Sequence, residues 1–465
     1  MDAATGVAGP ASASGGSKTE GGESRPPSGV RPQYDPRVTD HRLSELATGE
    51  RVISERVPGV RSVALGFWIG AGSRDEPEAR AGVSHFIEHL LFKGSSHYSA
   101  QQIAELFDEL GGELNAATSR ETTVVYARVP DDRLETALDV MADMVYRPLF
   151  EELDSEREVV LEEIAMVEDT PHDLVHDIAA EAVFGGHPLG RPVIGRAEVI
   201  SSVSRRALTG YHDRAYSGDR LVLAAAGNLR HERLVELIEE RRNGASTGKS
   251  LPARKPVRRL PSPGLRFQQK DTEQYHVCLS APGIARTDER RFAASILDAI
   301  VGGSASSRLF QEIREKRGMA YSVYSYASQY SDAGQIGFYV GTREENLPEC
   351  LEIAVAELAD LAAGNVRKDE LSRAKENLKG RLLLSLESTS NRMTRLGKAT
   401  ITETPLLTIE EIVRRLEAVT AAEVSALADE LLAVERLSAA GIGPDESRFR
   451  EAVARVSPQL LSEAA

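Results

Sequence analysis

Cysteine is scarce in this sequence, which contains only Cys278 and Cys350 among 465 residues. Two cysteines without C-x-x-C spacing cannot build a disulfide framework, and nothing in them indicates an oxidising compartment. Long hydrophobic runs are absent as well. Charged residues interrupt the longest apolar stretches within about ten residues, well short of the ~20 residues needed to span a bilayer. These absences exclude a disulfide-stapled secreted domain and a helical membrane protein.

Basic residues are outnumbered, with 56 Lys and Arg against 71 Asp and Glu and a net charge of −15. This charge disfavours nucleic acid and other phosphate-rich partners through long-range repulsion. The first residues also lack the apolar stretch of a secretory signal, and Asp2, Glu20 and Glu23 do not fit the acid-poor pattern of an organelle transit peptide. We therefore expect a cytoplasmic protein.

The composition, 41% hydrophobic and 27% charged, is typical of a soluble globular protein. A chain of 465 residues exceeds the roughly 250–300 at which single cores stop growing, so we expect at least two domains. Residues 1–35 are mostly Ala, Gly, Ser and Pro, which predicts a disordered tail. Residues 243–263 have linker composition and separate predicted domains at 36–242 and 264–460.

The two halves of the chain resemble each other. Three pairs of similar segments lie 214, 213 and 216 positions apart, and they begin at Ser62 and His276, at Tyr126 and Tyr339, and at Arg220 and Arg436. Such regular spacing indicates a duplicated domain of about 210 residues. Within each copy, β-branched runs alternate with helical patterns whose apolar residues recur every three or four positions. The predicted fold class is therefore α+β.

The segment AGVSHFIEHLLFKGS places His85, Glu88 and His89 within one helical pattern. Residues three and four apart share a helix face, so the two imidazoles can converge on one metal ion while Glu88 stays free beside them. This arrangement is H-x-x-E-H, the inversion of the H-E-x-x-H zinc motif. It predicts a zinc site.

A hydrolytic zinc site needs a third protein ligand and an open position for water. The helical run SEREVVLEEIAMVED supplies Glu156 and Glu163, seven residues apart and therefore on one face. One of them could bind the metal while the other supports the site from behind. The alternative is that both are solvated glutamates on an acidic surface helix, and the histidine pair favours the metal site.

The sequence resembles the pitrilysin family of inverted-motif zinc peptidases, especially the branch that contains the mitochondrial processing peptidase and its bacterial single-chain relatives. The resemblance extends from about Tyr34 to Arg448, and its main segments are HFIEHLLFKGS, LGGELNAATSRE, EREVVLEE, HPLGRPVIG and SSRLFQEIREKRGMAYSV. It implies two homologous metallohydrolase domains of the α+β class. It also implies one zinc per chain, with Glu163 as third ligand and Glu156 in support. Glu162 competes with Glu163, because the spacing from His89 is slightly short for the family.

The ligand set implies a mechanism. His85, His89 and Glu163 would hold zinc, which would lower the pKa of a bound water, and Glu88 would accept the proton as the water attacks a peptide carbonyl. Taken alone, Arg314 is a surface arginine and Tyr321 a half-buried tyrosine. The resemblance implies instead that this pair reaches across from the second domain to the substrate near the zinc.

Substrate-binding residues are also implied. The segment from Leu110 to Val129 predicts a turn and an alternating strand, and an edge strand can accept an extended peptide by β-addition. The resemblance places Asn115 and Ala116 on that edge. Phe92 matches a position that lines the pocket after the scissile bond, although a core position is the ordinary role of a phenylalanine.

A second histidine pair, His172 and His176, also has the i, i+4 spacing, but Val175 stands where a general base would be needed. We therefore do not expect a second metal site. On the same turns, Asp173 and Asp177 match an acidic pair that, in the processing branch, receives a basic side chain two residues before the cleaved bond. A solvated helix face is the alternative for these two aspartates.

These observations predict a zinc endopeptidase that cleaves extended or unfolded peptides, with a basic preference before the scissile bond. A non-catalytic scaffold or partner subunit of the same fold is the alternative, and the intact zinc motif argues against it. Because the family builds its chamber from four domains and this chain supplies two, we expect a homodimer, or a heterodimer with a related chain.

Overall fold

The computed structural model describes residues 41–242, 249–258 and 260–462. The predicted tail at 1–35 lies outside the described residues, as do residues 243–248 and 259 of the predicted linker. The rest of that segment contains neither helix nor strand. Its residue Arg254 forms hydrogen bonds with the first half of the chain. Arg254 donates from Nε to Oδ1 of Asp75 at 2.9 Å and from Nη2 to the carbonyl of Gly70 at 3.1 Å.

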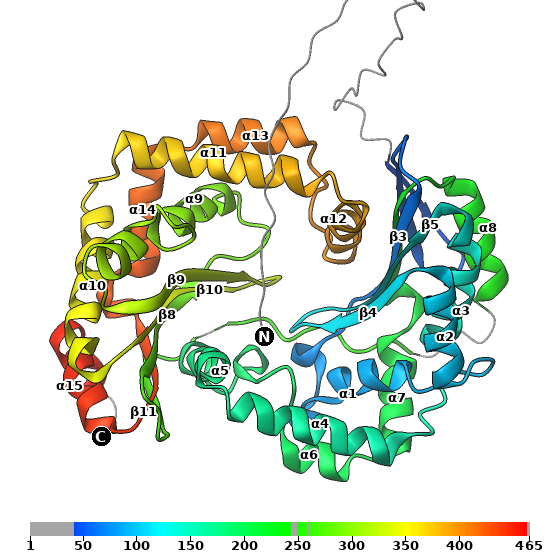
Figure 1. The fold of residues 1–465 in the computed structure, drawn as a ribbon, viewed down its shortest axis with the longest axis horizontal. Helices are drawn as coiled ribbons and strands as arrows, with labels where there is room; N and C mark the ends of the chain where they lie inside the picture. Colours follow the sequence, from blue (N-terminus) through cyan, green and yellow to red (C-terminus); the bar gives the residue numbers. More distant parts are fainter. Residues whose placement is uncertain (1–40, 243–248, 259, 463–465) are drawn as a thin grey trace, which may run out of the picture. The chain divides into compact units, whose positions relative to one another are not determined.

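The first half of the chain builds a six-stranded sheet in the order β1-β2-β6-β3-β5-β4 (Figure 1). Strands β2 and β6 are parallel and the other neighbours are antiparallel. Among the described strands, β4 pairs with β5 alone, so it forms one edge of the sheet. The strands are β1 (His41–Glu45), β2 (Arg51–Arg56), β3 (Ser62–Ile69), β4 (Glu113–Thr118), β5 (Thr123–Pro130) and β6 (Leu221–Gly227).

The second half builds a five-stranded sheet in the order β7-β11-β8-β10-β9. This order repeats that of β2-β6-β3-β5-β4, including the single parallel pair, here β7 with β11. The three predicted segment pairs lie on equivalent strands, which confirms the duplication. The strands are β7 (Leu265–Gln269), β8 (Tyr275–Gly283), β9 (Ala320–Gln329), β10 (Gly334–Thr342) and β11 (Ser438–Gly443).

Helices pack around both sheets, as the α+β prediction requires. In the first half they are α1 (Val83–Leu91), α2 (Ala100–Leu110), α3 (Leu134–Tyr146), α4 (Leu153–Glu168), α5 (Pro171–Phe184), α6 (Ala197–Ser202), α7 (Arg205–Ala215) and α8 (His231–Arg241). In the second half they are α9 (Arg291–Val301), α10 (Leu347–Ala362), α11 (Lys368–Ser385), α12 (Thr389–Ile401), α13 (Ile409–Ala418), α14 (Ala421–Leu432), α15 (Glu446–Val456) and α16 (Gln459–Ser462). Each half has its own large apolar core.

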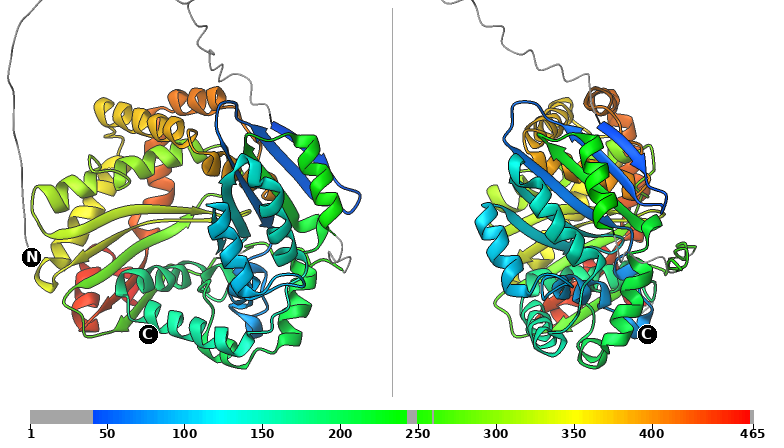
Figure 2. Two further views of the ribbon diagram at one scale, coloured as in Figure 1. Left: turned by 45° about the vertical axis from the view of Figure 1, so that its right-hand side comes forward. Right: turned by 90° about the vertical axis from the view of Figure 1, so that its right-hand side faces the viewer.

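One helix of each half packs on the sheet of the other half (Figures 1 and 2). Helix α12 packs on β2, β3 and β6, where Nε1 of Trp68 lies 3.4 Å from the sulfur of Met393. Gly397 of α12 has to be glycine, because a Cβ there would lie 2.0 Å from Nε1 of Trp68. Helix α5 packs on β8 and β11 and buries Val175 and Ala179. The two halves are therefore interlocked.

A buried carboxylate connects the turn between β4 and β5 with the second half. Glu121 accepts hydrogen bonds from Arg74 and Arg286, each at 2.8 Å, and from the backbone N–H of Ser331 at 3.0 Å. Burial alone would raise the pKa of Glu121, but the hydrogen bonds from Ser331 and the charges of Arg254 and Arg286 lower it. This network holds the edge strand β4 in a defined position relative to the second sheet.

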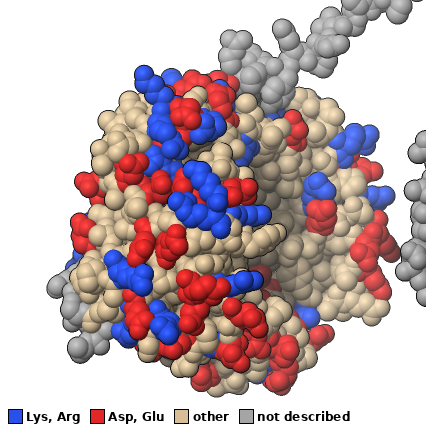
Figure 3. Space-filling model, turned by 60° about the vertical axis from the view of Figure 1, so that its left-hand side comes forward, with Lys and Arg blue, Asp and Glu red and all other residues tan. Residues whose placement is uncertain are grey.

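Within the described parts of the chain, no helix combines the length and the apolar character needed to cross a membrane. Basic and acidic side chains are interspersed on the face drawn in Figure 3. The net negative charge of the sequence is therefore not expressed as one acidic patch on that face.

Candidate metal centre

Helix α1 begins at a backbone turn that only glycine suits. The helix is preceded by Gly82 with φ of 98°, and a Cβ there would lie 2.7 Å from the Cα of Gly195. Glu76 caps the helix by accepting hydrogen bonds of 2.7 Å from the N–H groups of Gly82 and Ser84. Apolar residues of α1, such as Phe86, face the core. This packing turns the H-x-x-E-H residues toward the opposite side of the helix.

Two helices bring the predicted ligands together. His85 and His89 come from α1, and Glu163 comes from α4. Oε2 of Glu163 lies 3.3 Å from Nε2 of His89 and 3.7 Å from Nε2 of His85. Three donor atoms each about 2.0–2.1 Å from one tetrahedral zinc ion lie about 3.3 Å apart, so this spacing suits zinc. In the described residues this is the one group of three metal-binding side chains whose ligand atoms converge, within 4.8 Å of one another.

An unsatisfied polar atom at this site also fits a metal. Oε2 of Glu163 is buried and has no hydrogen-bond partner among the described residues. A buried carboxylate oxygen without a partner is costly unless a cation compensates it. Burial, together with the neighbouring His89, lowers the pKa of His85 to about 4. The His85 imidazole is therefore neutral near pH 7, as metal binding requires.

Glu156 supports the site from behind. Its Oε1 accepts a hydrogen bond of 2.9 Å from Nδ1 of His89, which leaves Nε2 of that ring directed at Glu163. A carboxylate that fixes the tautomer and orientation of a ligating imidazole is a common second layer of zinc sites. Glu162, the competing sequence assignment, is exposed on α4 and is not part of the converging group. Of the two glutamates, Glu163 is therefore the one that faces the histidines.

Glu88, the predicted general base, lies on α1 between the two histidines in the sequence. Its carboxylate accepts a hydrogen bond from the hydroxyl of Thr118, at the end of β4. Burial raises the pKa of Glu88, with the hydrogen bond from Thr118 opposing the shift. A carboxylate with a raised pKa binds a proton more readily, which suits proton transfer during catalysis.

The predicted peptide-binding strand is indeed an edge. Asn115 and Ala116 lie on β4, and the amide oxygen of Asn115 accepts a hydrogen bond of 2.8 Å from the N–H of Ala116. Beside this strand is a cavity of about 720 Å³. It opens next to the C-terminal end of α1, and its lining includes Phe92, Lys93, Ile103, Phe107, Leu114, Asn115 and Tyr126. Phe92 thus lines a cavity rather than only the core.

Helix α5 carries the second histidine pair and the two aspartates. His176 and His172 both contact the hydroxyl of Tyr324, at 2.8 and 3.2 Å, so these imidazoles join α5 to the second sheet. Asp177 forms an ion pair of 3.3 Å with Arg120, whereas Asp173 is 63% exposed. The two aspartates therefore differ, because one of them already has a cationic partner within the chain.

Arg314 and Tyr321 form a cluster of their own in the second half. Arg314 lies on a π-helical segment, Phe310–Glu315, and its guanidinium stacks between the rings of Phe310 and Tyr321, at 4.6 and 4.5 Å from their centres. Tyr321 is 79% exposed, not half-buried as an ordinary tyrosine would be. Among the described contacts this pair meets neither the histidines nor Glu163, so the structure leaves its role at the zinc site as a prediction.

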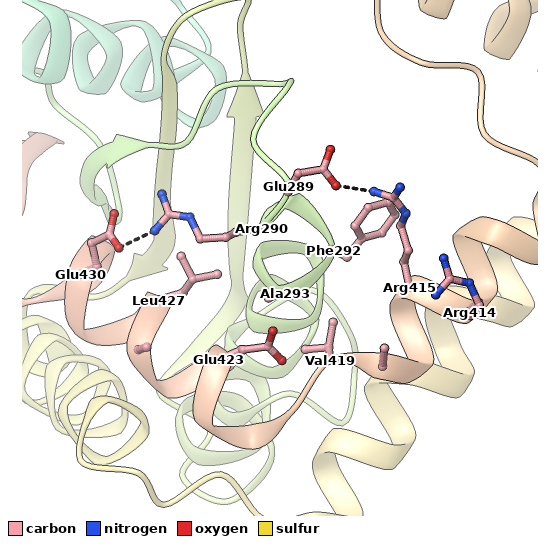
Figure 4. A pocket seen from close by; sticks show the side chains of 12 residues that line it. Glu289, Arg290, Phe292, Ala293, Arg414, Arg415, Val419, Glu423, Leu427 and Glu430 are labelled. Atoms are coloured by element: carbon pink, nitrogen blue, oxygen red, sulfur yellow. Dashed lines mark hydrogen bonds and ion pairs between the residues drawn. The ribbon is translucent and has the colours of Figure 1, made fainter.

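A second cavity, of about 460 Å³, lies in the second half between α9, α13 and α14 (Figure 4). Its charged side chains already have partners. Glu289 pairs with Arg415, and Arg290 pairs with Glu430 at 2.6 Å. Glu423 accepts a hydrogen bond from the N–H of Thr420, at the start of α14. This cavity has no converging polar groups for chemistry, unlike the site on α1 and α4.

Several residues at the site were not identified from the sequence. Thr118, which donates to Glu88, and Arg120, which pairs with Asp177, both follow the predicted edge positions within LGGELNAATSRE. Lys93 lies within the motif segment HFIEHLLFKGS, and Phe310 lies within SSRLFQEIR. Their place in those segments is a signal, but none of their contacts follows from spacing along a helix or strand.

Comparisons with known proteins show the family of this chain. The model of the insulinase peptidases (family M16) matches residues 51–197, and the model of the M16 inactive domain matches residues 202–378. An uncharacterized zinc protease of Streptomyces coelicolor is 41% identical over 89% of this chain and 92% of its own length. The uncharacterized zinc protease YmxG of Bacillus subtilis is 42% identical over 82% of this chain and 93% of its own.

Two solved structures share the fold. A peptidase M16 inactive domain from Pseudomonas fluorescens superposes with a TM-score of 0.82 at 24% identity, covering 87% of this chain and 98% of that one. A protease from Helicobacter pylori gives 0.81 at 20%, covering 87% and 99%. The fold and the site thus define a zinc metallopeptidase. The chain belongs to the insulinase family, peptidase family M16, and its cofactor is zinc, one ion per chain.

Proposed function

We propose that the protein is a zinc endopeptidase of the processing-peptidase type, which cleaves extended or unfolded peptides. The observation that carries the proposal is the convergence of His85, His89 and Glu163, with Glu88 beside them on the same helix as the histidines. A scaffold subunit has no need for this complete set of residues, so the enzyme is favoured over the non-catalytic alternative.

When bound, zinc supplies Lewis-acid activation of a water molecule and of the scissile carbonyl. Glu88 takes the proton from that water and later donates it to the leaving amine. Burial raises the pKa of Glu88 toward the range in which both transfers are efficient. The Thr118 hydroxyl donates a hydrogen bond that holds the Glu88 carboxylate in place. Glu156 accepts a hydrogen bond from Nδ1 of His89 and so keeps Nε2 of that ring free to bind the metal.

The substrate adds to the sheet as an extended strand along β4, next to Asn115 and Ala116. An edge strand offers free backbone groups to a peptide without requiring one sequence, which favours unfolded substrates. The side chain after the scissile bond enters the cavity of about 720 Å³ lined by Phe92. Aromatic and aliphatic walls there favour a large apolar residue at that position.

Arg314 and Tyr321 act on the substrate from the second half. Stacking between Phe310 and Tyr321 orients the Arg314 guanidinium, and its nearest carboxylate, Glu315, is 3.6 Å away and half exposed. The guanidinium therefore keeps donors available for a peptide carbonyl, and the exposed Tyr321 hydroxyl can add another. Donors aimed at developing negative charge contribute strongly to acyl-transfer catalysis.

A basic side chain two residues before the scissile bond is preferred because of Asp173 and Asp177. The exposed Asp173 is the stronger contributor, since Arg120 already occupies part of the Asp177 carboxylate. We also infer a homodimer rather than a heterodimer with a related chain, because one chain carries both the zinc motif and the Arg314/Tyr321 pair. Light scattering tests this assembly, and a fully active monomer contradicts it.

The activity is tested with a library of quenched-fluorescence peptides. We expect the zinc-loaded protein to cleave internal bonds, to lose activity with a chelator and to regain it with zinc. Mass spectrometry of the products then locates the cleaved bond and the residues on either side. Zinc-loaded protein that cleaves no peptide of the library would favour the scaffold alternative.

A further inference from the structure

A lysine contacts the carboxylate that supports the predicted zinc ligand His89. Nζ of Lys93 is 2.8 Å from Oε2 of Glu156, and Oε1 of the same carboxylate accepts the hydrogen bond from Nδ1 of His89. Both oxygens of Glu156 are thus engaged, one by a predicted zinc ligand and one by a cation. The side chain of Glu156 is 5% exposed and that of Lys93 is 31% exposed.

Because Glu156 is buried, its carboxylate depends on the ammonium group of Lys93 for charge compensation. A buried carboxylate without a nearby cation loses its hydration without compensation, so without the ammonium group the Glu156 carboxylate turns toward water. This rotation weakens the acceptor for Nδ1 of His89 and releases the orientation of that ring. Among the described residues, Lys93 is the one Lys or Arg side chain that pairs with Glu156.

We propose that Lys93 is a positioning residue for the zinc centre. Its ammonium group holds the Glu156 carboxylate, and that carboxylate directs Nε2 of His89 toward the metal. The inference rests on the proposed function and deepens it. Lys93 also lines the cavity of about 720 Å³ beside β4, so the support of the zinc centre can be reached from the substrate side. The alternative is an ordinary ion pair that contributes to folding alone.

The test replaces the ammonium group and then restores it. In Lys93→Cys, 2-bromoethylamine alkylates the new thiolate, forming a C–S bond with loss of bromide, and this returns an amine at nearly the same distance. The native thiols do not interfere. Cys278 and Cys350 are both buried, and burial raises the pKa of Cys278 to about 12 and that of Cys350 to about 11.

Lys379→Cys is the matched control, because Lys379 is 27% exposed and pairs with Glu376 at 2.7 Å on a helix of the second half. For each protein, zinc affinity is measured by competition with a chromophoric chelator, and the cobalt-substituted protein is examined by absorption spectroscopy. Kinetic constants and thermal unfolding of the metal-free protein complete the set.

We expect Lys93→Cys to bind zinc about 10-fold more weakly, with a shifted cobalt spectrum and a lower kcat at nearly unchanged KM. Aminoethylation should restore the zinc affinity, the cobalt spectrum and kcat. Lys379→Cys should match the parent before and after treatment. Parental zinc affinity in Lys93→Cys, or no recovery after aminoethylation of a folded variant, overturns the inference. If Lys93→Cys does not fold, Lys93→Gln is measured instead, and parental affinity there has the same meaning.

The two hypotheses fail in different ways. If His85→Ala binds zinc as tightly as the parent, the metal site itself is wrong and the proposed function fails with it. If the parent binds zinc through His85 and cleaves peptides while Lys93→Cys is unimpaired, only the role of Lys93 is wrong.

Discussion

Oε2 of Glu163 lies 3.3 Å from Nε2 of His89, although 74 positions separate the two residues in the chain. The distance is set by the packing of α4 against α1, where the Arg157 guanidinium lies over the ring of Phe86 at 5.8 Å. The ligand geometry therefore depends on how two helices pack.

The ligand set predicts that some substitutions remove zinc, whereas another keeps zinc and removes turnover. Glu163→Gln and His85→Ala should lose zinc, because each removes one of three ligands. Glu88→Gln should keep zinc but lower kcat by roughly 10²–10⁴-fold, because it removes only the proton acceptor. Metal content by plasma emission spectrometry and peptide hydrolysis measure both effects. Glu162→Gln is the control and should resemble the parent, while a metal-free Glu88→Gln beside a zinc-replete Glu163→Gln would reverse the assigned roles.

The stacking of Arg314 predicts that two substitutions in the second half lower kcat/KM to different extents. Arg314→Ala should lower kcat/KM by about 10²-fold with zinc content unchanged, because it removes a donor to the substrate. Phe310→Leu keeps the charge but removes one of the two stacked rings, so a smaller loss is expected. Steady-state kinetics at equal metal loading measures the order. Full activity of Arg314→Ala would show that this pair does not reach the substrate.

The acidic residues of α5 predict a positional preference. Asp173→Asn combined with Asp177→Asn should lower kcat/KM about 10-fold or more for peptides with Arg two residues before the cleaved bond, and should leave neutral peptides nearly unchanged. Asp173→Asn alone should account for most of the loss, because Arg120 already pairs with Asp177. Asp169→Asn, at the nearby end of α4, is the control. An unchanged preference in the double variant rejects the idea.

His176 predicts a dependence of stability on pH. Burial, with the charge of His172, lowers its folded-state pKa to about 4, below the usual 6.5. Between these values the unfolded chain binds a proton that the folded chain does not, so stability falls as pH drops from 6.5 toward 4. The loss is on the order of 3 kcal/mol for this group. The other charges near His176 are those of Asp173, which raises its pKa, and Arg120, which lowers it.

His176→Phe should therefore flatten the pH dependence while losing the hydrogen bond to Tyr324. Urea unfolding of metal-free parent and variant at pH 7.5, 6.0 and 5.0 measures the difference, and titrations at other sites cancel between the two proteins. Parallel curves for parent and variant would contradict the lowered pKa.

Much of the fold and of the zinc site could be predicted from local pattern. The i, i+4 spacing of His85 and His89 is a property of any α-helix, and period-two and period-3.6 hydrophobicity predicts strands and helices without knowledge of their partners. The duplication was visible because equivalent strands in the two halves keep similar residues. The edge position of Asn115 was implied by the resemblance to the pitrilysin family and not by local pattern, and β4 does end its sheet.

Sequence determined the residue types, their spacing on each element and the repeated order of elements. Only the tertiary structure decided which glutamate of α4 meets the histidines, that Lys93 supports Glu156, and that Arg120 already pairs with Asp177. It also decided that α5 and α12 each pack on the sheet of the other half. Such contacts join elements far apart in the chain, and they depend on packing angles and side-chain orientations that no local periodicity specifies.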